Sequence, residues 1–167
     1  RLGLVGSEMC IRDSGRPEDM ERVSSDIQAI IEGERLAREG SFQALSELDD
    51  RLAQSLPGSL LYPEATRLRI AWRLGLGTSE LAEQALVLVE VLSARDRKAE
   101  ELLLRAEAAG KVGKPEYVWA SLSRLSTSLT RNRRGQSLAR EALRTAAGIP
   151  PDEHAPDILA RFRRLGQ

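Results

Sequence analysis

Apolar residues recur at spacings of three and four from about residue 24 to the end of the chain, which is the pattern of amphipathic helices packed on one another. Short segments rich in Gly, Pro and Ser interrupt this pattern and mark helix ends. The interruptions divide the chain into four helical hairpins at about 26–56, 62–93, 97–130 and 135–165. We therefore expect an all-α fold in residues 22–167.

The hairpins repeat at about 35 residues. Gly40, Gly75 and Gly110 each follow an apolar helical turn and lie 35 residues apart. Because one hairpin cannot bury its apolar face alone, such a repeat predicts an α-solenoid of about four antiparallel helix-turn-helix units. Apolar columns recur in the second helices at steps of 36 and then 37: Leu45, Leu81 and Val118; Leu52, Leu88 and Leu125; Leu56, Leu92 and Leu129. Leu48, Ala85 and Leu122 form the remaining column.

The first hairpin follows from local signals. Ser24 or Ser25 caps a helix that buries Ile27, Ile30 and Ile31 and ends near Gly40. Ser41 then caps one continuous second helix, which Pro57 and Gly58 end. The last hairpin fits the repeat least well, as is typical of a terminal cap.

Residues 1–21 lack a sustained helical pattern, and two interpretations stay open. The string from Ser7 to Ser14 resembles a translated sequencing-adapter remnant, which would leave Cys10 without a selected role. The alternative is a disordered natural N-terminus. The first residue is Arg1 rather than Met, so we expect a fragment of a longer protein.

Composition indicates a globular protein, with 41% hydrophobic and 30% charged residues. The formal net charge is zero, but residues 18–64 carry −7 and residues 65–167 carry +6. This asymmetry favours a charged partner or association between copies, unless it reflects only solvated helix faces. No apolar run approaches the roughly 20 residues of a membrane span. Arginine far outnumbers lysine, which we associate with a bacterial source; both cytoplasm and periplasm stay open.

The residues that would carry chemistry are scarce. With one cysteine and one histidine, neither a disulfide within the chain nor a Cys/His metal cluster can form. The adjacent carboxylates Asp49 and Asp50 diverge on a helix, and the glycines before Thr78 lack the lysine of a phosphate loop. We therefore predict no enzymatic activity, no cofactor and no metal.

Two segments resemble the tetratricopeptide repeat. Ala37 to Leu45 is similar to the family's glycine turn, followed by an aromatic residue and an Ala-Leu pair that enter the second helix. Ser55 to Ser59, with Glu64-Ala65 and the run from Leu68 to Ala71, is similar to the connector between units in bacterial envelope repeat proteins. Leucines replace most of the family's small alanines. The resemblance implies a right-handed superhelix that binds a partner along a groove lined by the first helices.

These observations predict a non-enzymatic module that binds a peptide or protein. The alternative is a structural spacer or oligomerisation segment of a larger bacterial envelope or regulatory protein. We expect polar contacts to partner carboxylates from Arg38, Arg67, Arg73 and Arg105. A second candidate is a basic patch of Arg131, Arg133, Arg134, Arg140 and Arg144, continued by Arg161, Arg163 and Arg164. An anionic lipid surface would suit these arginines too, but without interleaved aromatic residues they favour an acidic protein over nucleic acid. The alternative is that they form only a solvated basic end of the chain.

Overall fold

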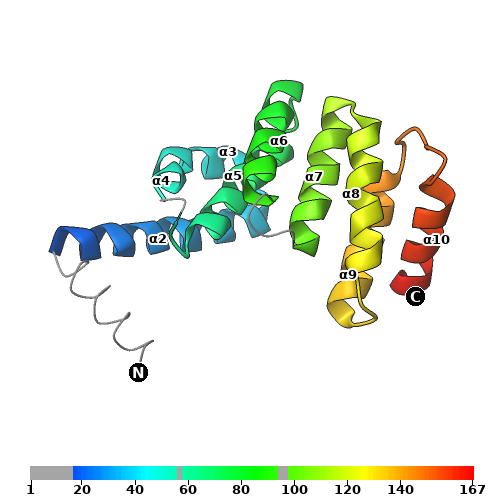
Figure 1. The fold of residues 1–167 in the computed structure, drawn as a ribbon. Coiled ribbons are helices and arrows are strands. Elements are labelled where there is room, and N and C mark those ends of the chain that lie inside the picture. The colour runs from blue at the N-terminus through cyan, green and yellow to red at the C-terminus, as the bar shows by residue number, and fades with distance from the viewer. Residues whose placement is uncertain (1–16, 56–57, 94–97) are drawn as a thin grey trace. The chain divides into compact units, whose positions relative to one another are not determined.

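The computed structural model describes residues 17–55, 58–93 and 98–167, and within these ranges every regular element is a helix (Figure 1). The prediction of an all-α fold is confirmed. Some predictions concern residues outside the described ranges, namely residues 7–14, with Cys10, and Leu56. The helices are α2 (Pro17–Glu39), α3 (Phe42–Ser46), α4 (Asp49–Ala53), α5 (Tyr62–Leu76), α6 (Ser79–Ser93), α7 (Ala99–Val112), α8 (Pro115–Ser128), α9 (Arg133–Ala146) and α10 (Ala155–Gly166).

The chain divides into two compact units, residues 1–68 and 69–167, with the division inside α5. In the first unit α2 packs against both α3 and α4. Its buried residues include Ile30 and Leu36 of α2, Leu45 of α3 and Leu52 of α4. This unit therefore consists of one long helix with two short helices against it.

The second unit has one continuous core that extends from Ile70 to Phe162. Each helix from α6 to α8 packs on the next, α9 packs on α10, and α7 also contacts α9 while α8 contacts α10. Contacts between every second helix place like helices beside one another in two rows. Trp72 and Trp119 are both buried.

Four glycines mark the ends of the first helices. Gly40, Gly77, Gly113 and Gly148 have φ between 72° and 81°, in the left-handed region that favours glycine. They are 37, 36 and 35 residues apart. The prediction that Gly75 and Gly110 end helices is wrong, since both lie inside helices. A Cβ on Gly110 would lie 3.2 Å from Ile149 Cδ1, so this glycine allows close packing rather than a turn.

The buried columns of the second helices recur at steps of 37, 36 and 37 residues. Two positions are at most 2% exposed in all four pairs: Leu45, Ala82, Val118 and Ala155; and Leu52, Val89, Leu125 and Phe162. The columns predicted through Leu81 and Leu88 were wrong by one residue, and both leucines are only half-buried. The error arose because the first step is 37 residues rather than 36.

The second helix of the first pair is broken. The predicted continuous helix is interrupted at Glu47 and Leu48, where each amide N–H donates to the carbonyl three residues earlier, Ala44 O at 3.2 Å and Leu45 O at 3.1 Å. Such tight turns replace the α-helical bonding pattern. Ser41 precedes α3 but its side chain makes no capping hydrogen bond, contrary to expectation.

Helix α2 begins at Pro17, so residues 17–21 are helical although the sequence pattern placed them in the N-terminal segment. Its buried side consists of Ala29, Ile30, Gly33 and Leu36. The predicted burial of Ile27 and Ile31 is wrong, since they are 42% and 63% exposed. Small residues allow α3 and α4 to approach closely, and they determine which side of α2 is covered.

Candidate interaction surfaces

Arg105 of α7 is enclosed by its neighbours. Its Nε donates to Glu90 Oε1 at 2.5 Å, and its Nη1 donates to Ser121 Oγ at 2.9 Å. The guanidinium lies 5.1 Å from the centre of the Tyr117 ring, and the side chain is 17% exposed. Arg105 therefore joins α6, α7 and α8, and its donors are directed inward.

The other three predicted partner-binding arginines also have contacts within the chain. Arg73 is buried, donates to Arg69 O at 2.8 Å and to Gln84 Oε1 at 3.2 Å, and lies over the Trp72 ring. Arg67 pairs with Glu64, and exposed Arg38 donates to Glu34 O at 3.4 Å. Arg38 and Arg67 belong to the first unit, whereas Arg73 and Arg105 belong to the second. The structure thus gives each of the four an internal contact.

The basic patch lies on the last helix pair. We define the arginine cluster as Arg131, Arg133, Arg140, Arg144, Arg161, Arg163 and Arg164, all of which are exposed. Arg131 donates to Arg164 O at 3.5 Å and Arg140 to Gly166 O at 3.1 Å, which brings the α9 arginines next to the last turn of α10. The side chains of the remaining five form no hydrogen bond or ion pair with any other residue of the described chain. Their donors are available to a ligand.

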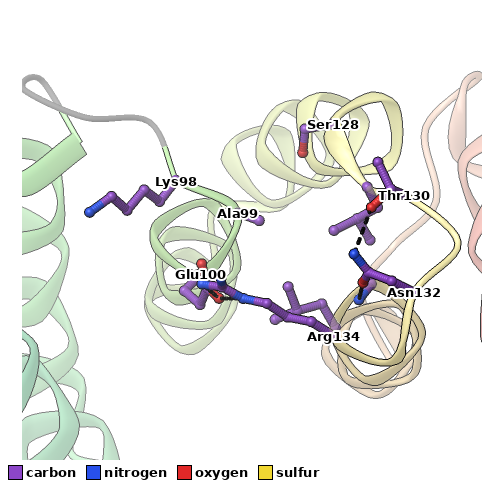
Figure 2. A pocket seen from close by; sticks show the side chains of 10 residues that line it. Lys98, Ala99, Glu100, Ser128, Thr130, Asn132 and Arg134 are labelled. Atoms are coloured by element: carbon purple, nitrogen blue, oxygen red, sulfur yellow. Dashed lines mark hydrogen bonds and ion pairs between the residues drawn. The ribbon is translucent and has the colours of Figure 1, made fainter.

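Arg134 belongs to a different environment. It pairs with Glu100 of α7 and lines a pocket of about 450 Å³ where the starts of α7 and α9 meet the end of α8. Figure 2 shows the Glu100–Arg134 pair between α7 and α9, with Lys98 directed away from it. Asn132 donates to Thr130 Oγ1 at 3.0 Å and accepts from Gly135 N at 2.8 Å. The polar side chains that line this pocket pair with one another, and the Glu100–Arg134 pair joins α7 to α9.

A second pocket, of about 580 Å³, lies between α8 and the segment that leads into α10. Trp119 forms part of its wall and donates from Nε1 to Pro150 O at 2.7 Å. His154 stands at the rim, 73% exposed, and its Nε2 lies 3.4 Å from Glu153 Oε1. An exposed histidine beside an exposed carboxylate is not the arrangement of a nucleophile and a positioned base.

Glu107 of α7 is a half-buried carboxylate whose pKa departs from its ordinary value. Burial raises its pKa above the ordinary 4.5, and the nearby Glu141 of α9 raises it further, while Lys111 lowers it. The carboxylate form of Glu107 is therefore disfavoured in the folded protein.

Neither a membrane span nor a metal site emerges from the described residues. None of their helices combines the length and the apolar character needed to cross a bilayer. They also contain no group of three or more His, Cys, Asp or Glu side chains placed to hold a metal ion. Comparisons with protein-family models, curated proteins and solved structures gave no match.

Proposed function

We propose that this chain is a non-enzymatic interaction module, built as a tetratricopeptide-like repeat of four hairpins with a right-handed superhelix, that binds an acidic protein partner. The left-handed glycines at steps of 37, 36 and 35, together with two columns buried in all four pairs, support the repeat. Buried positions that recur in this way are expected where the units of a solenoid stack on one another.

The arginine cluster is the binding surface in this proposal, and the observation that carries it is that five of its seven side chains have no partner within the described chain. Arg105, Arg67 and Arg35 pair with carboxylates of the chain, whereas Arg133, Arg144, Arg161, Arg163 and Arg164 have no such partner in the described part. Arginine presents a planar set of donors that matches a carboxylate. Large exposed apolar or aromatic side chains are missing from α9 and α10, which disfavours base stacking and membrane insertion.

Fluorescence anisotropy with a labelled oligoglutamate peptide tests this proposal on the full chain. We expect the triple variant Arg133→Gln/Arg163→Gln/Arg164→Gln to weaken binding at least about tenfold, with wild-type binding falling as salt rises. It spares Arg131 and Arg140, which bind α10 carbonyls.

The matched control is Arg22→Gln/Arg35→Gln/Arg38→Gln on α2, which removes the same charge and should bind like wild type. Equal loss in both variants would show that binding follows net charge alone and would refute the assigned surface. Tighter binding of a duplex DNA than of the peptide would refute an acidic protein as the partner.

A further inference from the structure

Helix α2 carries an apolar surface that the described residues of its unit leave exposed. Met20, Val23, Ile27 and Ile31 are 66%, 47%, 42% and 63% exposed. Their spacings of three, four and four place them along one side of the helix, and we call them the α2 stripe. Single exposed apolar residues are ordinary, but four in a continuous line indicate a contact surface.

Unpaired carboxylates border the α2 stripe. Asp19 and Asp26 directly precede Met20 and Ile27, and Glu34 follows Ile31 by three residues. None of the three forms an ion pair with another described residue, in contrast to Glu32 and Glu39, which both pair with Arg35. The surface is therefore apolar along its centre and negative at its edge, which favours a partner that offers cations on long apolar stems.

We propose that the α2 stripe docks on the arginine cluster of a second copy of this chain. An arginine side chain can lay its methylene stem along apolar surface while its guanidinium reaches a carboxylate at the edge. The cluster supplies five arginines without internal partners, and the chain as a whole carries no net charge that would make copies repel.

The two surfaces of this contact differ, which makes the contact heterologous. A copy that offers its α2 stripe still has its arginine cluster free, and its partner still has a free stripe. A dimer can therefore bind further copies, and assemblies larger than dimers form as the protein concentration rises. Because ion pairs at the edge contribute to it, association weakens as salt is added. The inference shares the arginine cluster with the proposed function but needs the stripe as well.

Two blocked variants of the full chain test this contact by analytical ultracentrifugation at low salt. Asp19→Lys/Asp26→Lys/Glu34→Lys blocks the stripe, and Arg133→Gln/Arg163→Gln/Arg164→Gln blocks the cluster without adding acids that a lysine-edged stripe would attract. We expect wild type to form assemblies larger than dimers and each variant to be monomeric. An equimolar mixture of the two should form dimers and nothing larger, because one competent surface of each kind remains.

The matched control is Glu80→Lys/Glu83→Lys/Glu116→Lys, which changes charge as the stripe variant does but at exposed acids of the second unit, and it should associate like wild type. A monomeric wild type, or a mixture that stays monomeric, overturns the inference. The stripe variant also separates the two proposals. If it binds oligoglutamate yet never pairs with the cluster variant, the proposed function stands and the docking inference falls.

Discussion

Arg105 and the arginines of the last helix pair occupy the same unit but have opposite environments. Arg105 lies where α6, α7 and α8 meet, and an acid, a hydroxyl and an aromatic ring surround it. Helix α10 packs against α8 and α9, and its Arg161, Arg163 and Arg164 are exposed. The same residue type thus links neighbouring helices in the interior of the stack and offers unused donors at its end.

The largest expected change in the free energy of unfolding comes from Gly135, at the start of the last helix pair, α9 and α10. A Cβ on Gly135 would lie 1.9 Å from the Thr130 carbonyl oxygen, a backbone atom that has little freedom to move. We expect Gly135→Ala to lower the free energy of unfolding by about 3 kcal/mol or more. Urea denaturation measures this, with Ser137→Ala on the exposed side of α9 as the control. An unchanged midpoint would show that the turn before α9 relaxes freely.

A leucine pair tests the corrected register. Leu125 is fully buried and Leu88 is half-buried, although the sequence placed them in one column. We expect Leu125→Ala to cost about 2–5 kcal/mol and Leu88→Ala at least about 1 kcal/mol less. Thermal and urea unfolding of both variants provide the comparison. Equal losses would contradict the register.

An arginine pair tests the comparison directly. Removing Arg105 leaves Glu90 and Ser121 without their shared donor, whereas removing Arg161 breaks no described contact. We expect Arg105→Ala to destabilise the fold by about 1–3 kcal/mol, a range that allows for solvent screening of half-exposed Glu90. Arg161→Ala should stay within about 0.5 kcal/mol of wild type. If both variants unfold alike, the distinction between interior and end arginines is wrong.

The smallest expected effect is a gain. Because burial and Glu141 raise the pKa of Glu107, the folded state disfavours its carboxylate form. The cost is absent below the ordinary pKa of 4.5, where the acid is protonated in both states, and it is complete above the raised folded pKa. We expect Glu107→Gln to stabilise the protein at neutral pH by about 0.5–1 kcal/mol and not at acid pH.

Urea unfolding at both pH values measures this gain, and Glu83→Gln on the exposed side of α6 is the control. A gain that persists at acid pH would show that it does not come from the charge of Glu107.

Much of the fold could be predicted because its signals are local. The stripe of Val118, Leu122 and Leu125 predicted α8, and the proline before it marks the helix start. The basic patch was also visible as a run of charge. The uncovered side of α2 was not predicted, because its apolar residues have the same spacing as a buried face. Ala29 and Gly33 form a second side of α2 made of small residues, and this was the signal in the sequence for which side is buried.

Sequence alone determined that the chain is helical and about where its breaks lie, because propensity, periodicity and turn residues act over a few positions. Tertiary structure decided which glycines turn, which of two neighbouring apolar residues is buried and which arginines find partners. Each of these depends on residues that are distant in sequence. Gly110 packs against Ile149, which is 39 residues away in sequence. Arg105 binds both Glu90 and Ser121, so only the folded chain distinguishes an arginine with internal contacts from one that is available to a partner.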